Sequence, residues 1–169
     1  MVLLGWVSTG SMNNARRWHT ASVLTNGKVL VTGGFGNSAT VNSTELYDSS
    51  TGTWTMTGSM NNLRYGHTAS VLTNGKVLVT GGWGSSGDSV NSTELYDPST
   101  GTWTMTGSMN NLRYGHTASV LTNGKVLVTG GWRSSGDSVN STELYDPSTG
   151  TWTMTGSMNN ERYGHTASV

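Results

Sequence analysis

Cysteine is absent from this chain of 169 residues. No disulfide, thiolate nucleophile or cysteine-ligated zinc can therefore form. Charged residues are also scarce, at 11% of the sequence, and nine basic residues balance nine acidic ones. Because no basic patch steers the chain toward nucleic acid or an anionic membrane, we expect neither of them as a partner.

Long apolar runs are missing as well. No stretch approaches the ~18 residues of a membrane-spanning helix. The apolar start, Met1 to Val7, is short and lacks the basic region of a signal peptide. Residues 6–14 (WVSTGSMNN) align with residues 54–62 (WTMTGSMNN), so the N-terminus already belongs to a repeat. We therefore expect no targeting segment, and the sequence does not fix the compartment.

What the sequence has in abundance is repetition. Residues 63–111 recur as residues 112–160 with one difference, Gly84 against Arg133, which indicates recent duplication or deliberate design. A period of about 40–50 residues is typical of a solenoid, propeller or array, in which each unit stacks on the next. We predict one repeat domain over residues 1–169. Its repeats are residues 15–62, 63–111 and 112–160, with partial copies at residues 1–14 and 161–169.

Each unit divides into four short strands joined by glycine-rich turns. An Asn-Gly pair such as Asn74-Gly75 between two apolar runs is the strongest short-range hairpin signal. The Val-Leu-Val run that follows is typical of a strand packed on both faces. Four antiparallel strands at this period describe one propeller blade. We predict strands at the same offsets in every copy, and in the first copy near residues 19–24, 28–32, 43–47 and 53–57.

A motif that occurs three times resembles the kelch repeat. Each copy has an apolar strand, a Gly-Gly doublet, a Tyr, and a Trp after six intervening residues. The motif residues are Gly33-Gly34, Tyr47 and Trp54; Gly81-Gly82, Tyr96 and Trp103; and Gly130-Gly131, Tyr145 and Trp152. The resemblance implies an all-β fold of kelch-type β-propeller blades, each a four-stranded antiparallel sheet, with three full blades and a partial blade. We expect the Tyr and Trp residues of the motif to lie in the core.

The two ends of the pattern leave a ring open. The outer strand, first seen at Trp6, and the inner strand, first seen at His19, occur four times, whereas the middle strands occur three times. Kelch-like propellers usually have six or seven blades, and the last inner strand, at residues 165–169, would have an unpaired edge. A homodimer that forms a six-bladed ring is the favoured solution. Open head-to-tail assembly, a fragment or engineered piece of a longer array, and a four-bladed monomer are the alternatives.

The longer loops of each repeat form the candidate binding face. Strand directions alternate, so the loop after Gly-Gly and the loop before each inner strand lie at the same end of the blades, and long loops on a rigid scaffold commonly bind partners. The resemblance implies peptide partners at this face, and glycans are the alternative. The aromatic residue after Gly-Gly recurs in every copy, which favours packing against the next blade over ligand contact. The candidate residues are Phe35, Tyr65, Trp83, Asp88, Tyr114, Trp132, Arg133 and Asp137.

A second set of repeated residues predicts a structural network rather than a metal site. A buried charge must be paired, so Arg64 and His67 are expected to bond with Glu94. Zinc would need all its ligands within about 2.1 Å of one ion, which histidines in different blades do not reach. We therefore expect no metal and no cofactor. The same network is expected in the next repeat for Arg113, His116 and Glu143.

The function that this pattern favours is that of a non-enzymatic scaffold or protein-interaction module. No nucleophile motif stands out from the repeat, so no catalytic residue is predicted. Copper radical oxidases have similar blades, but their chemistry needs a Cys cross-linked to a ligating Tyr, and this chain has no Cys. A carbohydrate-binding module that uses the loops of Trp83 and Trp132 is the alternative. The sequence also contains three glycosylation sequons, at Asn42, Asn91 and Asn140. They would matter only in a protein secreted by a eukaryote.

Overall fold

The computed structural model describes residues 8–167, which form strands, turns and loops. The predicted all-β class and the four-stranded blades are confirmed, because the strands group into three four-stranded sheets. The first sheet contains β1 (Thr20–Val23), β2 (Val29–Thr32), β3 (Thr44–Asp48) and β4 (Thr53–Thr57). The second contains β5 (Thr68–Val71), β6 (Val77–Thr80), β7 (Thr93–Asp97) and β8 (Thr102–Thr106). The third contains β9 (Thr117–Val120), β10 (Val126–Thr129), β11 (Thr142–Asp146) and β12 (Thr151–Met154).

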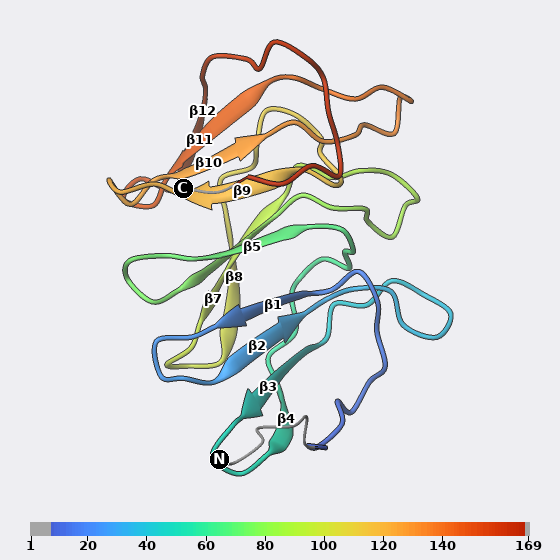
Figure 1. Cartoon of the computed structure of the whole chain (residues 1–169), viewed down its shortest axis with the longest axis vertical. Coiled ribbons are helices and arrows are strands. Elements are labelled where there is room, and N and C mark those ends of the chain that lie inside the picture. The colour runs from blue at the N-terminus through green and yellow to red at the C-terminus, as the bar shows by residue number, and fades with distance from the viewer. Residues whose placement is uncertain (1–7, 168–169) are drawn as a thin grey trace, which may run out of the picture.

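Each sheet follows the chain without a crossover. The strands lie side by side in sequence order, and every neighbouring pair in the second sheet is antiparallel. Figure 1 shows the three sheets as successive layers from the N-terminal to the C-terminal end of the molecule. The strand β5 contacts both β1 and β9, so these three strands form the inner side of the arc of blades. No helix in residues 8–167 is long and apolar enough to cross a membrane.

The core lies between the sheets, where apolar side chains from facing strands bury one another. In the second sheet, Val77 and Val79 pack toward the first sheet, whereas Leu78 between them packs toward the third. This division follows from the alternation of side chains across a strand. All three are at most 1% exposed. The Val-Leu-Val run is therefore buried on both faces, as its sequence predicts.

The Tyr and Trp of each motif form a cross-strand pair that faces the preceding sheet. Tyr96 lies opposite Trp103, with ring centroids 5.1 Å apart. The Tyr96 hydroxyl shares a 2.9 Å hydrogen bond with Thr57, and the Trp103 indole N–H donates to the carbonyl of Gly58 at 2.9 Å. Tyr96 is fully buried and Trp103 is 9% exposed. The pair thus joins adjacent blades as well as adjacent strands.

The Gly-Gly doublet allows the linking loop of the next blade to approach closely. Gly81 and Gly82 have φ values of 60° and 98°, a region that favours glycine. A Cβ atom on Gly81 would lie 2.6 Å from the carbonyl oxygen of Arg113. The Gly82 N–H donates to this same carbonyl at 2.8 Å. The doublet is therefore needed for contact between blades and not only for a turn.

The C-terminal end differs from the predicted pattern, and part of the N-terminal end is not described. The outer strand expected at Trp6 lies outside the described residues, as do residues 168 and 169. Residues 165–167 form no strand, contrary to the inner strand expected there, because the described residues provide no neighbouring strand to pair with it. Residues 8–14 pack along the first sheet, where the Gly10 N–H donates to the carbonyl of Gly52 at 3.1 Å.

Candidate functional site

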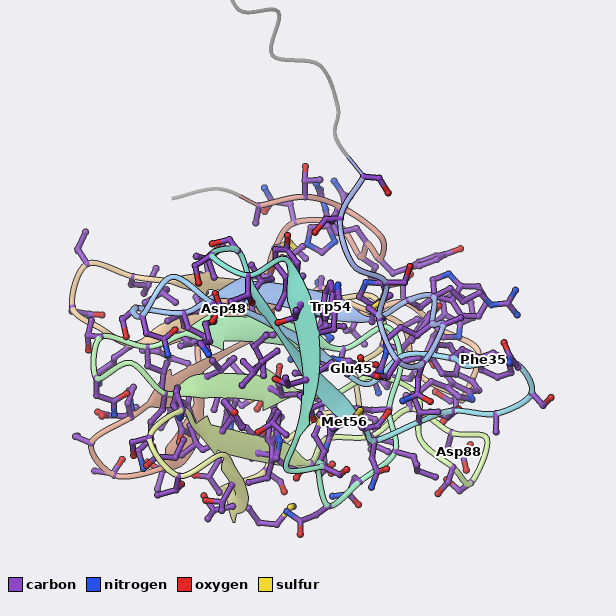
Figure 2. The ribbon with its side chains drawn as sticks, turned by 90° about the horizontal axis from the view of Figure 1, so that it is seen from below. Phe35, Glu45, Asp48, Trp54, Met56 and Asp88 are labelled. Atoms are coloured by element: carbon purple, nitrogen blue, oxygen red, sulfur yellow. The ribbon has the colours of Figure 1, made fainter. Side chains whose placement is uncertain are left out.

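The longer loops meet at one end of the sheets. The loop before β5 pairs with the loop after β6 through an antiparallel bridge between Tyr65 and Trp83, and the third sheet repeats this contact. Figure 2 places Phe35 and Asp88 at this end of the molecule and Asp48 at the opposite end. The sequence-predicted loop residues therefore gather on one face.

Seven aromatic side chains extend across this face, and we call them the aromatic row. Within it, Tyr65 contacts Trp18, Phe35 and Tyr114, with centroid distances of 5.3, 5.8 and 5.7 Å. Tyr114 also contacts Trp83 at 5.7 Å. Most of these contacts are edge-to-face, a favoured geometry for aromatic pairs. The row comprises Trp18, Phe35, Tyr65, Trp83, Tyr114, Trp132 and Tyr163.

The aromatic row borders two open hollows. One has a volume of about 430 Å³ and is lined in part by Phe35, Tyr65 and Trp83. The other has about 200 Å³, and its lining is entirely aromatic: Tyr65, Trp83, Tyr114, Trp132 and Tyr163. The rings are therefore packed against one another and also reachable by a ligand. This geometry reconciles the two interpretations of the residue after Gly-Gly, since packing leaves part of each ring open.

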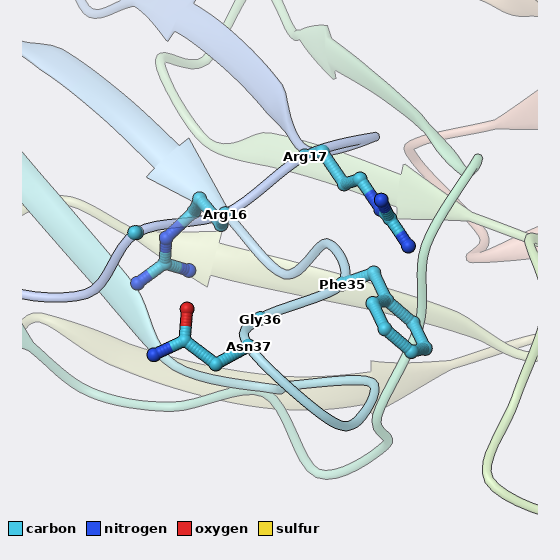
Figure 3. A pocket seen from close by; sticks show the side chains of 6 residues that line it. Arg16, Arg17, Phe35, Gly36 and Asn37 are labelled. Carbon is cyan, nitrogen blue, oxygen red and sulfur yellow. The ribbon is translucent and has the colours of Figure 1, made fainter.

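The first repeat departs from the others within this row. Arg17 and Trp18 stand where later copies have Tyr and Gly. Trp18 has a φ of 55°, an uncommon conformation for a bulky residue, and it is 52% exposed. The Arg17 guanidinium lies 4.5 Å from the Trp18 ring and 5.1 Å from the Phe35 ring. Figure 3 shows this cation beside Phe35, with Arg16 directed elsewhere.

The second copy needs glycine at the position of Trp18. A Cβ atom on Gly66 would lie 2.2 Å from the ring of Tyr114. The Gly66 N–H donates to the Trp18 carbonyl at 3.0 Å, and the Gly115 N–H donates to the Gly66 carbonyl at 3.1 Å. This chain of backbone hydrogen bonds links successive blades beneath the rings. The spacing of the aromatic row is thus set by the backbone.

A buried ion pair supports the loops from below. Arg64 and Glu94 are both fully buried, with Nη2 and Oε1 2.9 Å apart. The Arg64 Nη1 group donates to the carbonyls of Gly81 and Ser92 at 2.7 and 3.0 Å. Arg113 and Glu143 form the same pair in the third sheet at 3.0 Å. Because each charge is paired and hydrogen-bonded, its burial is tolerated.

The carboxylate of this pair also accepts hydrogen bonds from the linking loop. The backbone N–H groups of Asn61 and Asn62 donate to Glu94 at 2.6 and 3.0 Å, and the Asn61 side chain donates at 2.9 Å. Burial alone would raise the pKa of Glu94, but the hydrogen bonds from Asn61 and Arg64 outweigh it and lower the pKa. The repeated Asn-Asn pair was the sequence signal for this contact, which the sequence-based prediction missed.

The histidine part of the predicted network is wrong. His67 makes no hydrogen bond to Glu94; its Nε2 lies 3.0 Å from the hydroxyls of Thr20 and Thr32 in the preceding sheet. His116 makes the equivalent contacts with the second sheet. Burial, followed by nearby Arg113, lowers the pKa of His116 from 6.5 to about 3. These histidines are therefore neutral contacts between blades.

No group of three or more His, Asp or Glu side chains in residues 8–167 is arranged to hold a metal ion. Comparison with known proteins identifies the architecture instead. A family profile described as the KLHDC2/KLHL20/DRC7 Kelch-repeats domain matches residues 6–169. The chain belongs to the kelch-repeat family. Propellers of this family commonly serve as protein-interaction modules.

A solved structure, that of YjhT, has the same fold. It matches with a TM-score of 0.81 and 18% identity over 94% of this chain. The matched part is 57% of the YjhT chain, so three kelch blades span little more than half of that structure. At this identity the likeness concerns the fold alone. The search of curated proteins found no matching sequence.

The charged candidate residues lie at the tips of the kelch loops. Asp88 and Asp137 are exposed, and the Arg133 guanidinium is 3.9 Å from Asp137. An exposed ion pair of this kind contributes little to stability. Neighbouring tips are joined by a 3.0 Å hydrogen bond from the Ser134 N–H to the Ser89 hydroxyl. The structure thus brings the aromatic candidates together, whereas the charged ones remain at the rim.

The predicted sequons have a structural role in the kelch blades. The Asn42 side-chain amide donates to the Met60 carbonyl at 2.8 Å, and Asn91 donates to the Met109 carbonyl at the same distance. A glycan would be attached to that same nitrogen. Its attachment would therefore disturb a contact that holds the linking loop.

Proposed function

We propose that this kelch chain is a non-enzymatic scaffold that binds an extended peptide segment of a protein partner along the aromatic row. The observation that carries the proposal is the 200 Å³ hollow lined by Tyr65, Trp83, Tyr114, Trp132 and Tyr163. Tyr and Trp offer a large contact area and few rotatable bonds, which makes them frequent anchors of interfaces. Their rigid placement lowers the entropic cost of binding.

Electrostatics agree with a partner that is not strongly charged. The formal net charge is zero, and the Arg17 guanidinium contacts the rings of Trp18 and Phe35 at the first-repeat end of the row, outside the lining of the 200 Å³ hollow. The deeper charges of Arg64 and Glu94 neutralise each other and are fully buried. Contact would therefore depend on aromatic packing with apolar or aromatic side chains of the peptide.

Selection from a random peptide library tests this function. Peptides enriched on the immobilised protein should lose at least about tenfold in affinity on Tyr114→Ala, because an aromatic hot spot is removed. Met105→Ala is the matched control, since Met105 is 49% exposed on β8, outside the row. Circular dichroism must show that both variants are folded. A library without enrichment, alongside a positive glycan array, would replace this proposal with the carbohydrate-binding alternative.

We also propose that two copies complete the ring by self-association. Three blades align with 57% of the YjhT chain, so two copies provide enough blades for a ring of that size. The near-identity of residues 63–111 and 112–160 fits either recent duplication or deliberate design. Light scattering at micromolar concentration should give twice the 17.9 kDa chain mass. A monomer that remains folded on dilution would contradict self-association without affecting the peptide site.

A further inference from the structure

The free faces of the first and third sheets are complementary. Between the second and third sheets, Leu72, Leu78 and Met109 bury themselves against Val126, Val128, Tyr145 and Trp152. The free face of the third sheet carries Leu121 and Leu127, the copies of Leu72 and Leu78, and the copy of Met109 is Met158 in the C-terminal linking segment. The free face of the first sheet carries copies of the second group: Val29, Val31, Tyr47 and Trp54.

These copies have no covering sheet within the described residues, and all of them except Val31, which is 3% exposed, are only half-buried. Leu127 is half-buried, whereas Leu30 and Leu78 are 0% and 1% exposed. Trp54 is also half-buried, and Val23 on the same face is 68% exposed. Figure 2 looks onto the first sheet and shows Trp54 there. The two faces of one chain therefore match each other as the internal sheets do, and a second copy can supply the missing neighbour.

Two segments of related sequence would meet at such a junction. The N-terminal segment, residues 8–19, contains Gly-Ser-Met-Asn-Asn at residues 10–14, and the C-terminal segment, residues 155–167, contains it at residues 156–160. Between internal sheets, one linking loop bonds both neighbours. Its Met60 N–H donates to the Asn42 carbonyl of the sheet before it, and its Asn61 N–H donates to Glu94 of the sheet after it.

Each terminal segment makes only half of these contacts. The N-terminal segment bonds the sheet after it, through the Asn13 and Asn14 N–H groups to Glu45 at 2.6 and 3.0 Å. The C-terminal segment bonds the sheet before it, through the Met158 N–H to the Asn140 carbonyl at 2.9 Å. Only one segment can occupy each junction between two copies.

The N-terminal segment is the harder one to displace. Its Arg16 forms a 2.7 Å ion pair with Glu45, and both side chains are fully buried. Removal of Arg16 would leave Glu45 buried without its partner, which is strongly unfavourable. In the C-terminal segment, Arg162 is exposed, so its departure leaves no buried charge.

We propose that the third sheet of one copy docks on the first sheet of a second copy, and that the N-terminal segment of the second copy replaces the C-terminal segment of the first. This inference rests on the proposed self-association. His19 then takes the position of His165, whose Nε2 lies 3.1 Å from Thr117 and 3.2 Å from Thr129. The same exchange at the second junction closes a ring of six blades with two-fold symmetry.

Sedimentation velocity on the full chain and on two matched variants tests the exchange. His19→Ala should weaken the dimer at least about tenfold, because one or two hydrogen bonds are lost at each junction. His165→Ala should leave the dimer unchanged, because His165 is displaced from it. The reverse ranking would overturn the exchange while the dimer itself stands. A wild-type monomer would instead contradict the self-association on which the inference rests.

Two further variants test the docking faces and the displaced segment. Val23→Asp places a charge on the free face of the first sheet and should give a monomer, whereas Met105→Asp in the second sheet should remain a dimer. An unimpaired Val23→Asp dimer would overturn the docking face. Deletion of residues 155–169 should preserve or strengthen the dimer. Loss of the dimer in a deletion variant that keeps its β-sheet circular dichroism would show that the C-terminal segment closes the junction.

Discussion

Acidification should destabilise the protein through the histidines between its blades, well before its carboxylates are protonated. His116 is buried against Thr68 and Thr80, and its pKa is lowered from 6.5 to about 3. The unfolded chain therefore binds a proton near pH 6.5, which the folded chain does not. Stability is fully present above pH 6.5 and falls as the pH drops from there toward 3.

The magnitude follows from the two pKa values of His116. A pH of about 5.5 is one unit below the pKa of the unfolded side chain, which is therefore mostly protonated, whereas the folded side chain is still neutral. Each unit is equivalent to 1.36 kcal/mol, so His116 alone should lower the free energy of unfolding by about 1.4 kcal/mol between pH 7.5 and 5.5. His67 contributes in the same direction, since burial also lowers its pKa.

Urea unfolding followed by tryptophan fluorescence measures this effect at a fixed protein concentration. The window above pH 5.5 isolates the histidines, because the pKa values of Asp97 and Glu94 are lowered from values already near 4. His116→Gln keeps a polar group beside the threonines but cannot titrate. Its loss of stability on acidification should be smaller than that of the wild type by about 1.4 kcal/mol. Equal losses in both proteins would refute the reasoning.

Two substitutions test the packing between blades. Trp103→Ala should lower the free energy of unfolding by roughly 3–5 kcal/mol, the usual range for a buried aromatic residue. Its control, Met105→Ala at an exposed position, should change this free energy by less than about 0.5 kcal/mol. An unchanged urea midpoint for Trp103→Ala would contradict the assigned core. Gly66→Ala should be more destabilising than Gly27→Ala, because both positions have positive φ but only the first adds a clash with Tyr114. Equal thermal shifts for the two glycine variants would show that the ring moves aside without cost.

The repeat made the strands predictable and left the contacts between blades uncertain. A strand is encoded locally. The Asn-Gly turn and the Val-Leu-Val run therefore place the first two strands of every copy, such as β5 and β6 in the second sheet. Contacts between blades join residues about one repeat apart, and a periodic sequence does not say whether a side chain reaches its own blade or the neighbouring one. His67 was assigned to its own repeat for this reason, although it bonds Thr20 and Thr32 of the preceding sheet.

The aromatic face was predictable in part for the same physical reason. Loop order and strand direction placed Phe35 and Tyr65 at one end of the blades. The contact of Tyr65 with Trp18 depends on the left-handed backbone conformation at Trp18, which no local sequence pattern predicts. The substitution of Arg17-Trp18 for Tyr-Gly was the available signal, because a change inside a repeat identifies a position where the common backbone carries a different side chain.

In the proposed dimer, assembly and folding would use the same contacts. In a repeat array, stability is approximately the sum of the terms for each unit and for the interfaces between neighbours. The second sheet has a neighbour on both sides, whereas the described parts of the first and third sheets each have one. Docking of a second copy would add the missing interface to both outer sheets, so the Trp54 and Leu127 faces would gain the burial that Trp103 and Leu78 already have. Dimerisation should therefore stabilise the outer blades most, and the part of the aromatic row that the exchange leaves in place, from Trp18 to Trp132, would become more rigid along with them.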